Sequence, residues 1–170
     1  VKSVFLNCDA RKTNAIKDNS IQLTVTSPPF LDVVQYADDN WLRCWFNEIN
    51  IDKIESQITM AKKIEEWSNI MGNVFEELYR ITKNKGYVAF EVGEVRNGSI
   101  KLDEYVMPFG IKSGFNCIGI MINSQTFSKT SNCWGVNNNN KGTNTNRIVL
   151  FQKEEDLCQK KLKSKYWKTL

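Results

Sequence analysis

The residues best equipped to do chemistry lie in the segment Thr26-Ser27-Pro28-Pro29-Phe30, which directly follows the apolar run 21–25. Two consecutive prolines fix a stiff turn and cannot donate to a sheet ladder, so the carbonyls of Ser27 and Pro28 can point into a cleft. Such a carbonyl and the Ser27 hydroxyl can together accept both N–H groups of an amine on a planar base. Phe30 can stack on the face of that base, a contact worth about 1–3 kcal/mol.

The carbonyl, the hydroxyl and the aromatic ring together suit the addition of a methyl group to an exocyclic amine. The two hydrogen bonds compete with donation of the nitrogen lone pair into the ring, and they hold the nitrogen in line with a methyl donor. Such positioning can supply roughly 7 kcal/mol of the barrier. The sequence contains no histidine, which excludes histidine-based triads and imidazole general bases but leaves this reaction open, because the amine loses its proton after methylation. The diproline can also be only a rigid turn, and the motif alone does not decide between the two.

Composition indicates one ordinary globular domain. The chain has 170 residues, 41% of them hydrophobic and 25% charged, which is enough to bury a core. A net charge of +4 is compatible with a polyanionic partner without requiring one. Five cysteines without a C-x-x-C pair, in a chain without histidine, predict free thiols and no metal site. The start of the chain does not resemble a signal peptide and no apolar run is long enough to span a membrane, so we expect a soluble, cytoplasmic protein.

Hydrophobic periodicity predicts alternating strands and helices. The expected strands cover residues 4–6, 21–25, 87–92, 115–122 and 147–152. The expected helices cover residues 10–18, 39–47, 52–83 with a bend or break at Gly72, and 102–112, which contains Pro108. This alternation is typical of an α/β sandwich with a mostly parallel sheet.

Ligands of such sheets bind beyond the carboxyl ends of the strands. Asp9, the segment 26–30, Gly93-Glu94 and Asn123-Ser124 each follow an expected strand. We therefore expect them to converge on one edge of the sheet. The irregular stretch 126–146 is too long for an ordinary connection in a compact domain, which indicates a functional or disordered loop.

The sequence resembles a known family at several places. Thr26 to Phe30 is similar to the [S/T/D/N]-P-P-[Y/F/W] signature of S-adenosylmethionine-dependent amino-methyltransferases that act on DNA. The segment 18–25 resembles the strand that leads into this signature, and residues 34–37 followed by 40–43 are similar to the segment after it in one branch of the family. Residues 141–147 resemble the start of the family's last strand. The resemblance covers most of residues 4–152.

The resemblance implies a Rossmann-like methyltransferase sandwich in residues 1–152. The lysines clustered at 160–165 predict a basic C-terminal tail or helix in residues 153–170. It implies transfer of a methyl group from S-adenosylmethionine to an exocyclic amino group of double-stranded DNA. The serine form of the signature is associated mainly with N4 of cytosine and the aspartate form with N6 of adenine, so cytosine is favoured. Enzymes of this class extrude the target base from the duplex.

The resemblance also implies roles for individual residues. Ser27 and Pro28 would hold the amine, Pro29 completes the same catalytic loop, and Phe30 would stack on the flipped base. Asp9 and Thr26 would lie at the cofactor, although Asp9 is equally suited to a turn or helix cap. The expected DNA contacts are polar, aromatic or basic residues that can also be packing or solvated surface positions, namely Tyr36, Asn40, Arg43, Lys129, Asn146 and Arg147.

The glycine-rich loop F-x-G-x-G, with which the family approaches the methionine part of the cofactor, is not found in this sequence. Gly93 and Gly98 lie in a different pattern, so we expect a sheet that is incomplete on its N-terminal side. Three explanations stay open: a split enzyme completed by a second polypeptide that carries the loop, a truncated gene, or a remnant that no longer methylates. Homo-oligomers are also possible, because an unpaired strand edge seeks a partner. The competing functions are a non-catalytic DNA-binding or assembly subunit and an RNA or protein amino-methyltransferase.

Overall fold

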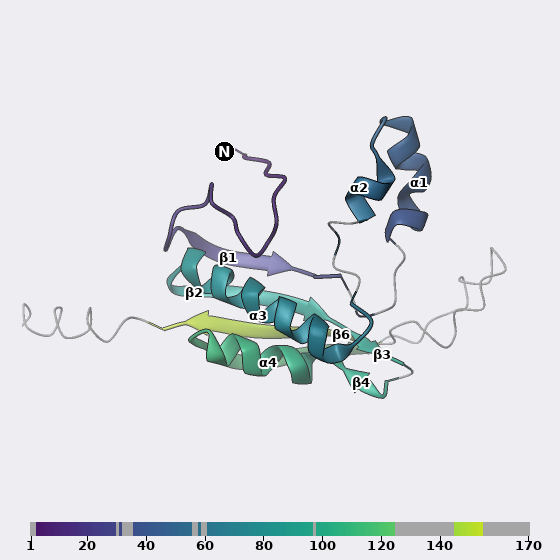
Figure 1. Ribbon diagram of the computed structural model, residues 1–170. Helices are drawn as coiled ribbons and strands as arrows, with labels where there is room; N and C mark the ends of the chain where they lie inside the picture. The colour runs from purple at the N-terminus through teal and green to yellow at the C-terminus, as the bar shows by residue number, and fades with distance from the viewer. Residues whose placement is uncertain are drawn as a thin grey trace, which may run out of the picture.

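The computed structural model describes residues 3–29, 31, 36–55, 58, 61–96, 98–124 and 145–154. The main sheet contains β1 (Ile21–Thr26), β2 (Thr82–Val92), β5 (Phe115–Ser124) and β6 (Thr145–Lys153). Two helices, α3 (Ile64–Ile81) and α4 (Leu102–Lys112), lie against one face of this sheet (Figure 1). Two short helices, α1 (Tyr36–Phe46) and α2 (Ile51–Glu55), project beyond the end of β1, and β3 (Glu94–Val95) pairs with β4 (Ile100–Lys101) in a small hairpin.

The strands of the main sheet follow the order β1-β2-β6-β5. β1 is parallel to β2, with Thr26 beside Phe90. β6 is antiparallel to both of its neighbours, and its Arg147 lies opposite Val92 of β2 and Ile122 of β5. The α/β class is therefore confirmed, whereas the pairing among the described strands is mixed and not mostly parallel.

The core fills the space between the sheet and the two helices. Alternate residues of β2, namely Val88, Phe90 and Val92, are fully buried on this side. The ring of Phe75 in α3 lies 4.8 Å from the ring of Phe90 and 5.1 Å from the ring of Phe151 in β6. Such tilted and edge-on ring pairs add to the stabilisation that burial of their area provides.

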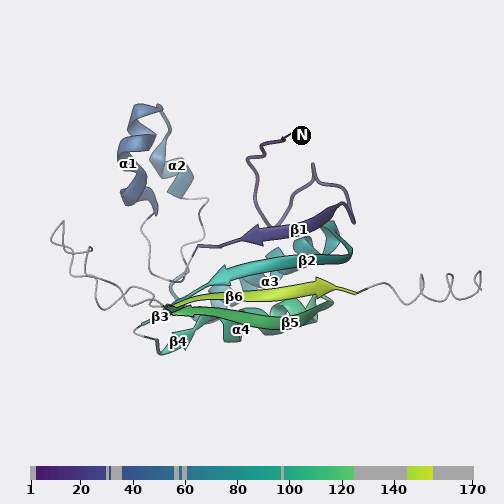
Figure 2. The same cartoon turned by 180° about the vertical axis from the view of Figure 1, so that it is seen from behind.

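The opposite face of the sheet is not covered by any helix in the described part of the chain (Figure 2). Leu23 and Val25 of β1 are 57% and 73% exposed there. They lie beside Tyr87 and Ala89 of β2, which alternate with the buried positions of that strand. We call this surface the open face, and it also includes Met121 of β5.

The segment before β1 is bound to α3 by polar contacts. Glu77 Oε1 accepts hydrogen bonds from the backbone N–H of Thr13 at 2.6 Å and from its hydroxyl at 2.5 Å. The Arg80 guanidinium donates to both oxygens of Glu77, at 2.6 and 2.8 Å, and also to Asp18. The Arg80 hydrogen bonds, helped by those from Thr13, lower the pKa of Glu77 to about 2.

Several predicted elements are confirmed and others are wrong. The helix over 102–112 is found with the predicted bounds although it contains Pro108, and the strands at 115–122 and 147–152 are found with small extensions. The single helix over 52–83 is wrong, because α2 and α3 are separate helices and β2 already begins at Thr82. Gly72 does not break α3. The ring of Phe109 packs against Gly72, in the space that a side chain on residue 72 would occupy.

The two predicted elements before β1 are also wrong. Residues 4–6 form no strand, and Val4 and Phe5 are 71% and 96% exposed. Residues 10–18 form turns instead of a helix. A strand requires a neighbour for its hydrogen bonds, and the described residues provide none for residues 4–6. None of the described helices is long and apolar enough to cross a membrane.

Candidate functional site

The diproline corner, residues 26–29, follows directly from the end of β1. Its main-chain position is fixed by the indole N–H of Trp67, which donates a hydrogen bond to the Pro29 carbonyl at 2.8 Å. Trp67 lies in the first turns of α3 and is only 1% exposed. Leu31, two residues after Pro29, is buried in the core. The corner is therefore held on both sides by residues that the core immobilises.

Two hydrogen-bond acceptors of the corner have no partner among the described residues. Ser27 is exposed. Neither its hydroxyl nor the Pro28 carbonyl accepts a hydrogen bond from another residue in the described part of the chain. A hydroxyl oxygen and a neighbouring carbonyl can bind the two hydrogens of one amino group. Phe30, the predicted stacking residue, lies outside the described residues.

Polar residues gather at the same end of the sheet as the corner. β1 and β2 are parallel, so Gly93-Glu94 follows β2 at the end where Thr26 closes β1. β5 ends and β6 begins at this end too, where Asn123 pairs with Asn146 (Figure 1). The predicted convergence on one edge is thus confirmed for these segments.

Asp9 is not brought to this edge. It borders a hollow that is lined also by Asn73 and Arg80 of α3. Asn73 and Arg80 lie about 9 and 20 Å along the axis of α3 from Trp67, because a helix rises about 1.5 Å per residue. The hollow is therefore separated from the corner that Trp67 holds. The Asp9 carboxylate accepts hydrogen bonds from Arg11 at 2.9 and 2.5 Å, which lower the pKa of Asp9. The cofactor role of Asp9 stays a prediction that this arrangement does not support.

The predicted DNA contacts divide into four groups, of which Arg147 forms the last. Asn40 and Arg43 lie on α1, beyond the end of the sheet, where the Arg43 guanidinium donates to Asn40 Oδ1 at 2.7 Å. Asn146 lies at the edge described above. The side chain of Tyr36 and the whole of Lys129 are outside the described residues.

Arg147 has a different environment from the other predicted contacts. Its guanidinium donates to Asp103 of α4 at 2.6 Å, and the two side chains are 11% and 2% exposed. A paired, nearly buried guanidinium is poorly placed to reach a phosphate. Arg147 therefore joins β6 to α4. Sequence reasoning missed both Asp103 and Trp67, because helical spacing shows only an acidic first turn and an apolar stripe at these positions.

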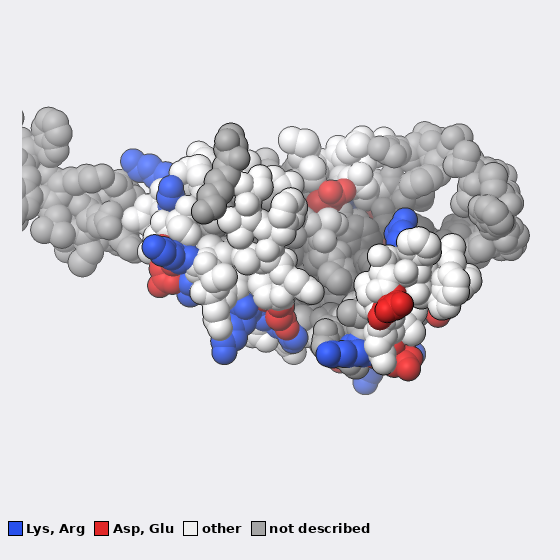
Figure 3. All heavy atoms as spheres, turned by 90° about the horizontal axis from the view of Figure 1, so that it is seen from above, with Lys and Arg blue, Asp and Glu red and all other residues white. Residues whose placement is uncertain are grey.

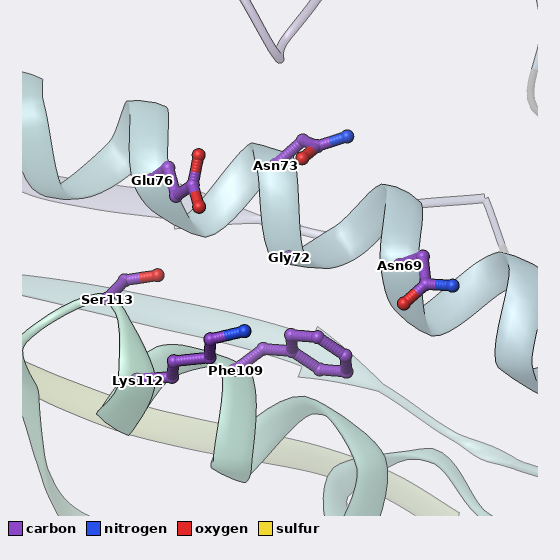
Figure 4. A pocket seen from close by; sticks show the side chains of 7 residues that line it. All are labelled: Asn69, Gly72, Asn73, Glu76, Phe109, Lys112 and Ser113. Carbon is purple, nitrogen blue, oxygen red and sulfur yellow. The ribbon is translucent and has the colours of Figure 1, made fainter.

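A further hollow lies between α3 and α4 on the outer side of the helix layer (Figure 4). Its volume is about 540 Å³, and none of its lining residues belongs to the corner. The lining residues are mostly polar: Asn69, Gly72, Asn73, Glu76, Phe109, Lys112 and Ser113. This hollow is separate from the candidate site.

The described residues do not fit the whole of an S-adenosylmethionine site. Close approach of a backbone to a ligand calls for glycines in a tight loop. Gly98, with a φ of +79°, instead lies in the turn between β3 and β4. With Asp9 also away from the corner, the described residues provide no cradle for the methyl donor.

Comparison with known proteins identifies the fold. No family model matches the chain, and no curated protein matches it. A protein of Thermus thermophilus, named as a candidate DNA modification methylase, is similar with 20% identity and a TM-score of 0.52 over 86% of this chain and 51% of that one. A structure of that protein complexed with S-adenosyl-L-methionine gives 19% identity and a TM-score of 0.52, over 86% of this chain and 54% of that one.

This chain therefore spans about half the length of the solved protein it matches. At such identity the likeness shows the fold alone, and it confirms the expected Rossmann-like α/β fold. The predicted division into residues 1–152 and a basic tail stays a prediction, since residues 155–170 lie outside the described part.

Proposed function

We propose that this chain is the amine-holding part of a DNA methyltransferase that uses S-adenosylmethionine and methylates N4 of cytosine in preference to N6 of adenine. The observation behind the proposal is the diproline corner, which Trp67 fixes at the end of β1 with the Ser27 hydroxyl exposed. The fold likeness to the Thermus thermophilus protein supports it, because that protein is named as a candidate DNA modification methylase and one of its structures holds S-adenosyl-L-methionine.

The residues of the corner act on the acceptor base. The Ser27 hydroxyl and the Pro28 carbonyl accept the two N–H groups of the exocyclic amine, so its lone pair is turned away from the ring. Fixed geometry is what the corner contributes, and positioning alone is worth several kcal/mol, roughly 7 at the low end. The nitrogen loses a proton to solvent once it carries the methyl group. A chain without histidine is therefore no obstacle to the reaction.

Double-stranded DNA is the proposed partner. The exposed Arg43, with Asn40 one helical turn before it, is placed on the projecting α1 to reach the backbone of DNA whose base enters the corner. Asn146 lies at the sheet end from which the base would be approached. We leave Arg147 out of this surface because Asp103 already binds its guanidinium. The net charge of +4 agrees with a polyanionic partner.

A non-catalytic assembly or DNA-binding subunit is the second candidate. The distance of Asp9 from the corner and the missing glycine-rich loop favour it. Calorimetry of the purified chain with S-adenosylmethionine separates it from an autonomous enzyme. One-to-one binding of S-adenosylmethionine by the chain alone contradicts the interpretation as a non-catalytic subunit.

Nucleoside analysis tests the proposed reaction. DNA is incubated with the chain in its native assembly and S-adenosylmethionine, digested, and analysed by mass spectrometry for N4-methylcytosine and N6-methyladenine. Pro28→Ala is expected to lower the modification by at least about a hundredfold, since a misplacement of about 1 Å costs that much. Lys112→Ala, on the helix layer away from the corner, is the matched control and should leave it unchanged. Equal modification in both variants means that the corner is only structural.

A further inference from the structure

The projecting helix α1 carries a strongly apolar exposed surface. Large apolar side chains recur along α1 and the turn after it at positions i, i+1, i+4, i+5 and i+8, so they share one face of the helix. Their exposed fractions range from 46% to 79%, and they are Trp41, Leu42, Trp45, Phe46 and Ile49. We call this surface the aromatic face. A contiguous exposed patch of large apolar side chains marks an interaction site.

The other described helix of the projection leaves the aromatic face uncovered. α2 packs against α1, and the half-buried positions Asn40 and Cys44 show which side of α1 is partly covered. At 3.6 residues per turn, both lie about 100° or more around the helix axis from Trp45 and Phe46. Figure 3 shows the molecule from above, where the projecting helices face the viewer and much of their described surface is uncharged. The aromatic face is therefore accessible to a further segment.

The two projecting helices are acidic, in contrast to the chain as a whole. Residues 36–55 contain five acidic and two basic residues, whereas the whole chain has a net charge of +4. Four of the acidic side chains are exposed, namely those of Asp38, Glu48, Asp52 and Glu55. An apolar face with acidic surroundings does not suit the phosphates of DNA. It suits a helix that is apolar on one side and basic on the other.

The chain itself contains a segment of this chemistry. Apolar side chains stand at every fourth position from residue 158 to residue 170, which predicts an amphipathic helix, and they are Cys158, Leu162, Tyr166 and Leu170. The same stretch contains five lysines and no acidic residue. We call residues 158–170 the basic segment. Its apolar stripe and its charge are complementary to the aromatic face and the acidic residues around it.

We propose that the aromatic face of α1 binds the basic segment of a second copy of this chain, and that the exchange is mutual, so that two copies form a dimer. The apolar stripe of the segment packs against Trp45 and Phe46, and lysines at its margins face Asp38 and Glu48. The dimer does not depend on the proposed methyl transfer. Arg43 lies on another side of α1 and stays outside this interface.

The length of chain after β6 explains why the segment comes from a second copy. β6 ends at the end of the sheet away from α1 (Figure 1). Its nine residues separate the two ends by about 26 Å. The chain from Glu154 to Cys158 reaches at most about 14 Å, and a helix over the basic segment adds about 20 Å. Only the last few residues of the segment could then reach α1 of the same chain, whereas mutual exchange buries both aromatic faces with one kind of contact.

Photo-crosslinking between isotopically distinct copies tests the proposal. In the purified full chain, the photoreactive residue p-benzoylphenylalanine replaces Trp45, and in a control it replaces Val25 of β1, which is 73% exposed against 72% for Trp45. Each chain is mixed with the unsubstituted chain labelled with nitrogen-15, irradiated and analysed by mass spectrometry. The proposal expects position 45 to crosslink to the labelled basic segment and position 25 not to do so. Crosslinks to the basic segment of the same copy only, to other parts of the chain only, or to nothing overturn it.

A charge swap tests whether the two surfaces are complementary. Lys163→Glu with Lys165→Glu reverses the charge at both margins of the apolar stripe and should raise the dissociation constant of the dimer about tenfold in analytical ultracentrifugation. Asp38→Lys with Glu48→Lys, added to the same chain, exchanges the signs and should restore the constant to within about threefold.

The matched control for the charge swap is Lys62→Glu with Lys63→Glu, which changes the net charge equally at exposed positions before α3. It should leave the dissociation constant unchanged. A monomeric wild type, or equal weakening by the two lysine pairs, contradicts the docking.

The apolar contact is tested by removing one side chain at a time. Trp45→Ala should raise the dissociation constant at least about thirtyfold, because a buried tryptophan contributes strongly to an interface. Leu162→Ala should weaken the dimer in the same direction. Phe5→Ala, at a position that is 96% exposed and lies outside α1, should leave it unchanged. An undiminished dimer in Trp45→Ala and Leu162→Ala, with circular dichroism showing an intact fold, contradicts the proposal.

Discussion

The indole of Trp67 offers the sharpest test of how the corner is held. Trp67→Phe keeps an aromatic ring in the core and removes the N–H that binds the Pro29 carbonyl at 2.8 Å. The lost hydrogen bond costs about 1 kcal/mol. The smaller ring leaves a void at a position that is 1% exposed, which costs roughly another 1 kcal/mol. The free energy of unfolding should therefore fall by about 2 kcal/mol.

The matched control is Trp45→Phe in α1. Trp45 is 72% exposed, so its replacement should change stability by less than about 0.5 kcal/mol. Urea unfolding followed by circular dichroism measures both variants without relying on tryptophan fluorescence. Methyl transfer by the native assembly should fall about tenfold to a hundredfold in Trp67→Phe and stay constant in Trp45→Phe. Equal stability and equal activity of the two variants would refute the anchoring of the corner by Trp67.

Three further predictions concern the scaffold. Gly110→Ala would place a methyl group 2.3 Å from a ring carbon of Phe151 in β6 and should lower the free energy of unfolding in urea by about 1–3 kcal/mol. Gly119→Ala is the control, because a methyl group there meets nothing within 4 Å. Equal effects of the two variants contradict the packing of α4 against β6. Glu77→Gln should cost about 1–2 kcal/mol at pH 7 after allowance for solvent screening. Because the pKa of Glu77 is lowered from 4.5 to about 2, its contribution is complete above pH 4.5 and is lost as the pH falls towards 2. The urea midpoints of variant and wild type should therefore converge over that range, and a gap that persists at pH 2 contradicts the assignment. Asp103→Asn leaves the nearly buried Arg147 guanidinium without its carboxylate. The free energy of unfolding should fall by about 3 kcal/mol, which a thermal melt would detect. An unchanged melting temperature contradicts a structural role for the pair.

Elements with local signals were predictable from the sequence. The helix over 102–112 and the last two strands of the sheet follow from periodicity and from turn residues such as Gly114, whose φ is +105°. The diproline corner follows from the chemistry of proline. Its position at the same end of the sheet as Asn146 follows from the rule that strand ends meet at one edge of the sheet.

Features that depend on distant neighbours were not predictable. Val4 and Phe5 have strand propensity, but a strand forms only beside another strand. The hydrogen bond between Trp67 and Pro29 joins residues 38 positions apart, and the Arg147 pair with Asp103 spans 44. Periodicity cannot reveal such contacts. Asp9 follows an expected strand that is not formed, so its expected place at the edge was lost with that strand.

The central claim is that the Ser27 hydroxyl and the Pro28 carbonyl hold the amine that is methylated. Quantification of methylated nucleosides in DNA treated with the native assembly, for wild type, Ser27→Ala and Pro28→Ala, tests it most directly. The account predicts N4-methylcytosine in the wild-type reaction and its loss in both variants, with S-adenosylmethionine binding retained. Undiminished methylation in the variants, or an assembly that binds S-adenosylmethionine and leaves DNA unmodified, would contradict it.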